Sequence, residues 1–481
     1  MKRRCSLIYI LITSAIIILS GCSRTSGSIA RIWTNQSEFV SYVELFNSSQ
    51  DRYKIVVEYR QNPAEALIAA KQNPDIIVGP WLKGEKARGQ VIPVEYLFNE
   101  LRINSRLFYK PLLDLGAVKH RQYLLPVSFN LPAMLFPQEY SAVMENDYSI
   151  SLGHIQQLSK EFTIEKDGQV TRMGFSPRWN REFLFLTAQM FGSRFEEGQA
   201  YLAWNDQQLS TGVEYLRNWS RTINSGTQAE DDFQFKYLYD PPYRLVTSGK
   251  SLFSYISSDE LLKLSHDKLL NVDFRWLMNE DAIPVRDDIV YMGICRKAKN
   301  LPAAEAFMIW FFKEETQRDL LERSREMGLF DQSFGLSGGF SSLQAVNERA
   351  FPLFYPILFG HLPPPDSLSV PRILPNDWDK AKTDVILPFL ESAVTVEPRM
   401  DNLNTELSAW ENELPDNACC VSARQPKLSY PKATGEEKPE GYWHTGRQRP
   451  RGCESGRWDV CRPGDAIPSP IADTRQMIHQ N

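Results

Sequence analysis

Cysteine is almost missing from the body of this 481-residue chain, which holds only Cys295 between Cys22 and Cys419. One thiol cannot form an internal disulfide, so a disulfide framework is excluded for this region. Cys295 ends the apolar run that begins at Ile289. Because nothing beside it would activate a thiol, we predict a small buried side chain rather than a reactive one.

An excess of positive charge is also missing, since 54 Lys and Arg stand against 59 Asp and Glu. Binding to the phosphates of nucleic acid requires a basic surface, so no nucleic-acid partner is expected. The histidines lie singly, without the spacing of a metal site, and adjacent carboxylates such as Glu196 and Glu197 point in different directions. We therefore predict neither a metal nor another cofactor, and no glycosidase chemistry.

The N-terminal apolar stretch, Leu7 to Leu19, is too short for a membrane span, which takes about 20 residues. It follows Lys2, Arg3 and Arg4 and leads into Ser20-Gly21-Cys22, the pattern of a bacterial lipoprotein signal. We predict a signal peptide over residues 1–21, a lipid on Cys22 and a polar tether over residues 22–29. The mature protein is then anchored to the cell membrane, facing the periplasm or the cell exterior.

Residues 417–481 have a different character. They are crowded with Pro, Gly, Arg and Lys and show no helix or strand period. This composition predicts a disordered tail, and a frameshifted end is the alternative interpretation. Cys453, Cys461 and His444 lack paired metal-ligand spacing.

The region after the tether alternates strand and helix patterns. Ala30 to Trp33 and Asp75 to Val78 are short apolar runs, and Tyr53 to Tyr59 alternates as a strand does. Two helices are expected between them, over residues 36–46, with Phe39, Val40, Val43 and Phe46 on one face, and over residues 63–70. This order predicts a mostly parallel sheet covered by helices, with ligands bound beyond the carboxyl ends of its strands.

Several segments, in this order, resemble extracellular solute-binding proteins of family 1, the maltose-binding-protein-like components of ABC importers. The matching segments are Ile32-Trp33-Thr34-Asn35, Pro74 to Val78, Tyr123 to Val127, Ala133 to Phe136, Met190 to Ser193, Val246 to Ser254 and Ile289 to Leu321. The last includes a helix over residues 302–313, for which Asn300 is the expected N-cap. The resemblance covers roughly residues 30 to 415.

The resemblance implies an α/β, periplasmic-binding-protein-like fold with two α/β lobes around a hinge and a ligand cleft. Lobe one is expected over residues 30–127 plus 289–334, and lobe two over residues 131–283 plus 335–414. The implied function is capture of a small polar solute, a sugar or oligosaccharide, by hinge closure and its delivery to an ABC permease. No chemical step is required, and a monomer suffices.

Aromatic residues at strand ends and in polar loops are the best candidates for the cleft, because aromatic faces stack on sugar rings. Polar residues beside them complete the expected ligand-binding set. The set is Trp33, Asn35, Trp81, Ser128, Asn130, Trp179, Arg181, Tyr255, Ser257 and Tyr291.

Two other functions stay open. Gly335-Leu336-Ser337-Gly338-Gly339 matches the nucleophile elbow of a lipid-anchored serine hydrolase using Ser337, although the strand before it, the helix after it and the order of Asp and His are wrong. We therefore expect a turn or hinge loop there and no catalytic residue. A surface adhesin on the same fold is the other alternative.

Overall fold

The computed structural model describes residues 29–99, 102–395 and 402–413. The predicted signal peptide, the lipid on Cys22, nearly all of the tether and the tail over residues 417–481 lie outside the described residues. Within the described ranges, no helix is both long and apolar enough to cross a membrane.

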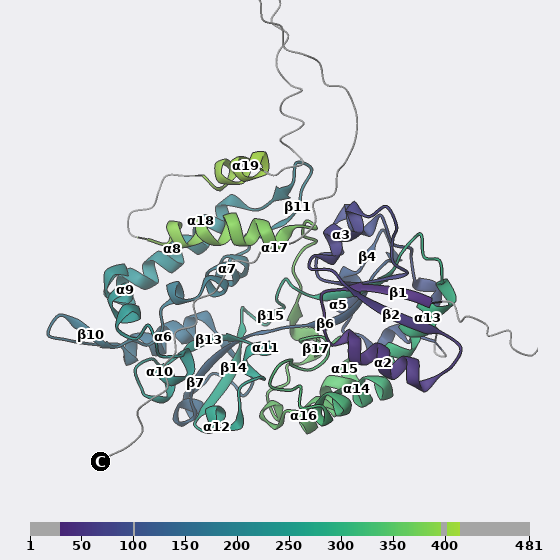
Figure 1. Cartoon of the computed structure of the whole chain (residues 1–481). Helices are drawn as coiled ribbons and strands as arrows, with labels where there is room; N and C mark the ends of the chain where they lie inside the picture. Colours follow the sequence, from purple (N-terminus) through teal and green to yellow (C-terminus); the bar gives the residue numbers. More distant parts are fainter. Residues whose placement is uncertain (1–28, 100–101, 396–401, 414–481) are drawn as a thin grey trace, which may run out of the picture. The chain divides into compact units, whose positions relative to one another are not determined.

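A six-stranded sheet forms the centre of what we call the first lobe (Figure 1). The expected parallel pairing is confirmed for β1, β2 and β3, because β1 pairs with both β2 and β3 in parallel. The sheet as a whole is mixed and not mostly parallel, because β16 runs antiparallel between β3 and β6, and β17 runs antiparallel to β6. In spatial order the strands are β17 (Phe340–Ser341), β6 (Leu125–Phe129), β16 (Val290–Ile294), β3 (Ile76–Gly79), β1 (Ile29–Thr34) and β2 (Lys54–Tyr59).

Helices cover this sheet and close its core. They are α2 (Phe39–Ser49), α3 (Pro63–Ala69), α4 (Glu85–Arg88), α5 (Lys110–Leu115), α13 (Leu301–Phe311), α14 (Glu314–Glu326), α15 (Gln344–Arg349) and α16 (Phe351–Phe354). Phe39 of α2 stacks on Phe311 of α13, with ring centroids 5.7 Å apart. Val40 was expected on the same buried face, but it is 52% exposed, and Tyr42 is buried in its place.

Asp75 ties β1 to the start of α13. One carboxylate oxygen accepts the backbone N–H of Arg31, and the other accepts those of Lys299 and Asn300. The prediction that Asn300 caps this helix is wrong, because its side chain makes no capping bond and donates to the carbonyl of Ile29 instead. The buried carboxylate of Asp75, immediately before β3, thus binds the N–H groups at the start of α13.

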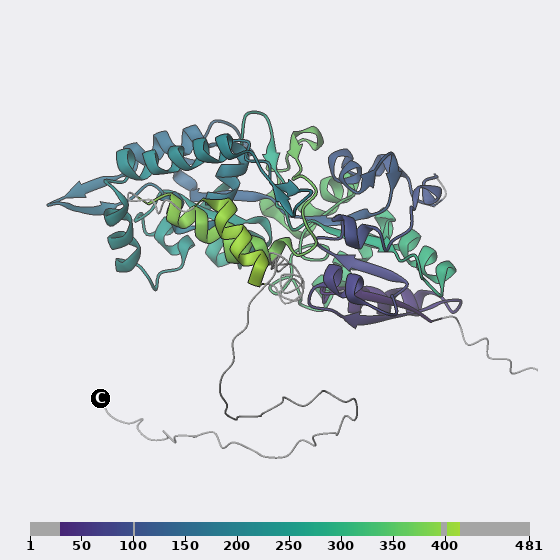
Figure 2. The ribbon, with the colours of Figure 1, turned by 90° about the horizontal axis from the view of Figure 1, so that it is seen from above.

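A four-stranded sheet forms the centre of the second lobe. Its spatial order is β13 (Ser254–Ser257), β7 (Pro132–Pro137), β14 (Val272–Met278) and β8 (Ser149–Ser151). The helices of this lobe are α6 (Leu152–Phe162), α7 (Arg181–Met190), α8 (Asp206–Ile223), α9 (Thr227–Lys236), α10 (Pro242–Thr247), α11 (Ser258–Leu261), α12 (His266–Leu269), α17 (Trp378–Ala381), α18 (Leu387–Ala393) and α19 (Leu403–Glu413). A π-helical turn, η7 (Lys382–Ile386), joins α17 to α18, and α19 packs on it (Figure 2).

The chain passes between the lobes at three places within the described residues. The first pass joins β6 to β7, and the second leads from β15 (Ile283–Pro284) into β16. The third runs from α16 through β18 (Leu368–Ser369) to α17, and β18 pairs in parallel with β15. Two neighbouring passes are therefore held together by strand pairing.

The boundary between lobe one and lobe two that the sequence predicts after residue 334 differs from the strand pairing in the structure. Residues 335–414 were assigned to lobe two, but β17 pairs with β6 at the edge of the first sheet. Phe340 packs on Phe129, Phe334 and Phe351, with ring centroids 5.0 to 5.7 Å apart. Burial of this aromatic cluster holds residues 335–354 against the first lobe.

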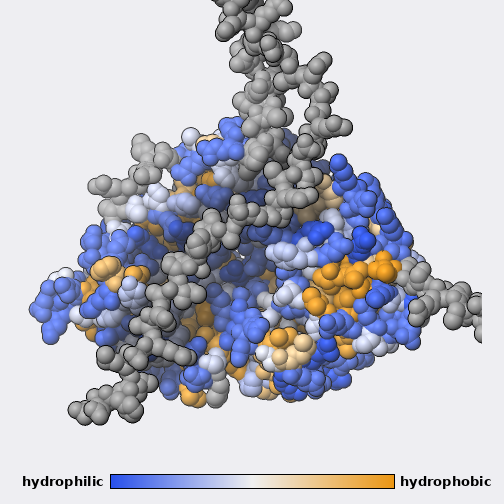
Figure 3. All heavy atoms as spheres, viewed as in Figure 1, coloured by the Kyte–Doolittle hydropathy of each residue, from blue (hydrophilic) through white to orange (hydrophobic). Residues whose placement is uncertain are grey.

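One face of the strand pair β1–β2, of which β2 is the edge strand of the sheet, is partly exposed. Ile29 of β1 and Val56 of β2 are 49% and 39% exposed, and Figure 3 shows hydrophobic surface over these strands. The opposite face is buried, because Ile32 and Ile55 have almost no exposed area. The β1–β2 edge therefore alternates between core and surface as a half-buried strand pair does.

Candidate ligand-binding site

Polar residues follow the parallel strands of the first sheet, where each strand ends. Asn35 and Gln36 follow β1, Gln61 and Asn62 follow β2, and Trp81 follows β3. The carboxyl ends of parallel strands meet at one edge of a sheet. All five residues line one cavity of about 300 Å³, which we call the inter-lobe cavity.

The second lobe and the passes supply the other walls. Asp259 comes from α11, Asp379 from α17 and Asn376 from the loop before α17, whereas Asp288 lies on the second pass. The complete lining is Asn35, Gln36, Gln61, Asn62, Pro63, Ala64, Pro80, Trp81, Asn130, Asp259, Asp288, Val290, Ser337, Gly338, Asn376 and Asp379. A ligand here would contact both lobes at once.

The lining is polar and acidic, with a single aromatic ring. Six of its side chains are amides and three are carboxylates, and among the described residues no lysine or arginine lines it. Amides both donate and accept hydrogen bonds, as hydroxyl groups do, and carboxylates accept them. The cavity therefore suits a polyhydroxylated or cationic solute and disfavours an anion.

Two lining residues have left-handed backbones although neither is glycine. The φ angle is 61° at Trp81 and 52° at Ser337. A bulky residue rarely adopts this region, and such strain persists only where the surroundings impose it. Both residues line the inter-lobe cavity, so its wall contains two positions of strained backbone.

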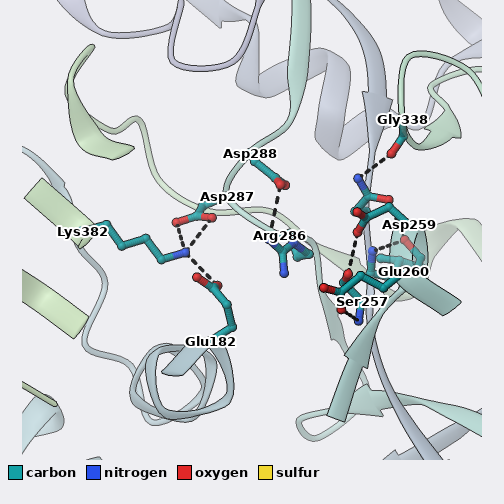
Figure 4. Close-up of polar contacts among 12 residues, drawn as sticks. Glu182, Ser257, Asp259, Glu260, Arg286, Asp287, Asp288, Gly338 and Lys382 are labelled. Atoms are coloured by element: carbon teal, nitrogen blue, oxygen red, sulfur yellow. Dashed lines mark hydrogen bonds and ion pairs between the residues drawn. The ribbon is translucent and has the colours of Figure 1, made fainter. Parts of the chain in front are cut away.

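The Ser337 turn is fixed by neighbouring strands and helices. Ser337 N–H donates to Tyr42 Oη at 3.0 Å, and its carbonyl accepts from Ser128 Oγ at 3.0 Å. Asn130 Nδ2 donates to the carbonyl of Gly338 at 2.9 Å, a contact visible in Figure 4. The motif therefore forms a turn, as predicted.

This turn does not resemble a nucleophile elbow. The strand β17 follows Ser337 instead of preceding it. Within the part of the chain that the structure describes, Ser337 Oγ bonds to Gln36 Oε1 at 3.2 Å, and no histidine hydrogen-bonds to it. The geometry gives no support to a hydrolase that uses Ser337.

An ion cluster around Lys382 includes Asp287, the neighbour of Asp288 on the second pass (Figure 4). Lys382 Nζ lies 2.9 Å from Asp287 Oδ2 and 2.8 Å from Glu182 Oε2, and Trp378 Nε1 donates to Asp287 Oδ2 at 2.7 Å. Burial opposes the charge of Asp287, but Lys382 and the Trp378 hydrogen bond outweigh it and lower the pKa of that carboxyl. Burial raises the pKa of Asp379, and the nearby charge of Asp287 raises it further.

The other two lining carboxylates have closer partners. Asp288 Oδ2 lies 3.4 Å from Arg286 Nη2. Asp259 Oδ1 accepts a hydrogen bond from Ser257 Oγ at 2.5 Å, within the capping box that begins α11. Both are drawn in Figure 4. The carboxylates are thus held in position before any ligand arrives.

Three of the ten sequence-predicted residues line this cavity, namely Asn35, Trp81 and Asn130. Ser128 and Ser257 do not line the cavity but hydrogen-bond to residues that do. Ser128 donates to the carbonyl of Ser337, and Ser257 donates to the carboxylate of Asp259. Five of the ten are therefore joined to the cavity directly or through one hydrogen bond.

Three further predicted residues are packed away from the cavity. Trp33 donates from Nε1 to Glu58 at 2.8 Å, with Arg60 over its ring. Tyr291 is fully buried, and its hydroxyl donates to the carbonyl of Leu112. Tyr255 is 7% exposed and packs on Phe183. None of these three side chains lines the inter-lobe cavity.

The last two, Trp179 and Arg181, line a separate cavity of about 480 Å³ in the second lobe. Trp179 stacks on Phe233 with ring centroids 5.4 Å apart, and Arg181 Nε pairs with Glu391 at 2.6 Å. In this structure they are not brought together with Asn35 and Trp81.

A larger cavity, of about 1010 Å³, also borders both lobes. It is lined by residues of α5, the end of α7 and the passes at 282–287 and 369–373. None of the ten predicted residues lines it, and neither do the residues that follow β1, β2 and β3. We therefore take the inter-lobe cavity as the candidate site. In the described ranges, no group of three or more His, Cys, Asp or Glu side chains is arranged to hold a metal ion.

No protein-family model matches the sequence, and no curated protein matches it significantly. Solved structures do match. A cyclo/maltodextrin-binding protein complexed with maltotetraose matches with a TM-score of 0.55 and 12% identity, over 85% of this chain and 100% of the other. An ABC substrate-binding protein from Listeria monocytogenes, in complex with cycloalternan, matches with a TM-score of 0.52 and 14% identity, over 82% and 99%.

A bacterial solute receptor with an exclusive preference for β-D-galactopyranose matches with a TM-score of 0.52 and 13% identity, over 82% of this chain and 100% of the other. At these identities the similarity concerns the fold. The mixed α/β architecture expected from the sequence, of the periplasmic-binding-protein-like type, is thereby confirmed.

Proposed function

Because the chain has the fold of ABC substrate-binding proteins, we propose that it is a solute-binding protein that captures a sugar or oligosaccharide between its lobes. One observation carries the proposal. The inter-lobe cavity lies at the carboxyl ends of β1, β2 and β3 and is lined from both lobes. Ligands of open α/β sheets bind at this edge.

The lining favours a sugar among small polar solutes. Amides and carboxylates can satisfy hydroxyl groups on every side of a ring, and Trp81 offers one aromatic face for stacking. The volume of about 300 Å³ is at the lower end of the range of small-molecule sites. The similar solved proteins include ones bound to maltotetraose and to cycloalternan.

Capture follows from contacts on both lobes. A solute held by Asn35 and Trp81 on one side and by Asp259 and Asp379 on the other favours the closed arrangement by its extra affinity for that state. No bond is made or broken, so the protein acts as a receptor and not as an enzyme. A monomer contains the whole site.

Delivery to an ABC permease completes the proposed role. The lipid predicted on Cys22 would keep the protein beside the membrane, and the predicted polar tether before β1 would leave the lobes free to close. In this arrangement the closed, loaded form is the one presented to the permease.

The test is a melting-temperature screen of the full chain against galactose, mannotriose, maltotetraose and a panel of amino acids and anions. A ligand bound only by the folded state raises the melting temperature, so we expect at least one neutral sugar to do so. Isothermal titration then gives its affinity. No shift with any sugar, or a shift with anions alone, would contradict the proposal.

A further inference from the structure

The lobes contact each other directly beside the inter-lobe cavity, through Asn376. Its Nδ2 donates to the carbonyl of Trp81 at 2.6 Å, and its Oδ1 accepts the N–H of Ala87 at 3.2 Å. Asn376 is only 7% exposed. Both ends of one buried amide are therefore bound to the backbone of a single segment.

That segment belongs to the other lobe. Leu82 and Ala87 follow β3 of the six-stranded sheet and lie in the largest apolar core, whereas Leu374 and Trp378, on either side of Asn376, lie in a separate core of the second lobe. Trp81 packs against both cores. The Asn376 contact can therefore exist only while the two lobes are together.

Gly84 makes room for this contact. A Cβ atom added to Gly84 would lie 2.7 Å from Nδ2 of Asn376, closer than atoms in contact can approach. The φ angle of Gly84 is -56°, which every residue tolerates. An alanine here would leave the local backbone unstrained and push the Asn376 amide away.

Two other inter-lobe contacts lie nearby but are more exposed. Glu197 accepts the N–H of Glu85 with both oxygens, at 3.0 and 2.9 Å, and Lys380 pairs with Glu65 at 2.5 Å. The Lys380 side chain is 43% exposed, so its ion pair contributes little. Asn376 makes the buried polar contact of this interface.

We propose that Asn376 is a positioning residue that couples lobe closure to the site: in the closed state it holds the strained backbone of Trp81 and so presents the indole ring to the solute. This inference rests on the proposed function. When the lobes open, the Trp81 carbonyl and the Ala87 N–H lose these partners, and the ring loses its packing on the second lobe. Trp81 is then ordered for binding only after closure.

Hydrogen exchange of the solute-free full chain tests the contact without any ligand. The variants are Asn376→Ala and Gly84→Ala, with Gly153→Ala as the matched control, because a Cβ at Gly153 meets nothing within 4 Å. We expect the amides of residues 84–88 to exchange about tenfold faster in the first two variants and at the parent rate in the control. Parent-like exchange in Asn376→Ala and Gly84→Ala would overturn the proposal.

Solute dissociation tests the coupling, with the tightest-binding sugar of the screen as probe. Gly84 does not line the cavity, so Gly84→Ala removes no ligand contact. We expect both variants to raise the dissociation rate about tenfold with little change in association, and the double variant to add little, since both break one contact. An unchanged dissociation rate in Gly84→Ala, or additive effects, would overturn the coupling.

The two measurements separate this inference from the proposed function. If no sugar binds the parent protein, the proposed function fails, while hydrogen exchange still decides whether Asn376 joins the lobes. If sugars bind and exchange at residues 84–88 is unaffected, the proposed function stands and the Asn376 contact is refuted.

Discussion

Asp287 and Asp288 are adjacent in the chain but line different cavities: Asp287 borders the larger cavity, and Asp288 borders the inter-lobe cavity. Successive side chains of an extended segment point to opposite sides, which explains the division. Lys382 pairs with Asp287 and lies away from the inter-lobe lining. The second pass therefore carries a structural charge on one side and a ligand-facing charge on the other.

Removal of the Lys382 charge should destabilise the protein strongly. Lys382→Met leaves Asp287 buried without its main partner, and an uncompensated buried charge costs about 3–5 kcal/mol. Lys380→Met is the matched control, because its side chain is 43% exposed and its loss should cost about 1 kcal/mol or less. Urea unfolding measures the free energy of unfolding of both variants. An equal decrease in the two variants would show that Lys382 does not stabilise the protein by neutralising Asp287.

Trp81 should matter for sugar binding, and Trp179 should not. Trp81→Ala removes the aromatic ring of the inter-lobe cavity, and we expect affinity to fall about tenfold or more. Trp179→Ala changes the separate cavity of the second lobe and should leave affinity within about twofold of the parent. Isothermal titration decides between them. A loss confined to Trp179→Ala would place the site in the second lobe.

Lys83 should make stability depend on pH. Burial lowers the pKa of Lys83 to about 7, and its side chain lies over the Tyr291 ring. Between about pH 7 and pH 10 the unfolded chain binds a proton that the folded protein lacks, so parent stability rises with pH across this window. Below it, the folded protein carries a buried ammonium group.

Lys83→Met removes the free-energy cost of burying a charged ammonium group. We therefore expect the variant to be more stable than the parent by about 2–4 kcal/mol at pH 6 and by much less near pH 10. Urea unfolding at the two pH values measures the difference. The exposed neighbour Lys86, changed to Met, is the control and should show no such dependence. A gain that is equal at both pH values would contradict the assigned pKa.

Cys295 should be inert in the folded protein. It is a free thiol with 1% exposure, so a reagent cannot reach its sulfur. Burial also raises the pKa of the thiol, so little of the reactive thiolate forms. We expect iodoacetamide to modify the Cys295 peptide roughly 100-fold more slowly in buffer than in urea, as read by mass spectrometry. Similar rates in the two conditions would mean that β16 opens readily.

Much of the first lobe could be predicted from the sequence, because its strands and helices carry strong hydrophobic periods. The strands ending at Trp33, Tyr59 and Val78 were placed within one residue of β1, β2 and β3. The boundary at residue 334 was wrong because β17 has only two residues and no detectable period. Its position depends on aromatic packing around Phe340, which no local pattern reveals.

The candidate site was predictable where it follows strands. The sequence identifies Asn35 and Trp81 by their positions after strands and Asn130 by its position at the predicted crossover. The rule used for Asn35 and Trp81 also selects Gln61 and Asn62 after β2. Asn376 and Asp379 had no such signal, because they reach the cavity from the beginning of α17 through packing of the second lobe. For Trp179 and Arg181 the sequence pattern was misleading. Their polar loop with an aromatic residue resembles a cleft loop, but it lines a different cavity, in the second lobe.

The place of β16 in the first sheet has a consequence for synthesis. This strand joins β3 to β6, yet it follows nearly the whole second lobe in the chain. Until residues 290–294 have left the ribosome, β1, β2 and β3 have no strand linking them to β6. β3 therefore lacks its neighbour β16 along one edge while more than 200 later residues are synthesised. Closure of the first sheet is therefore a late step in the synthesis of this chain.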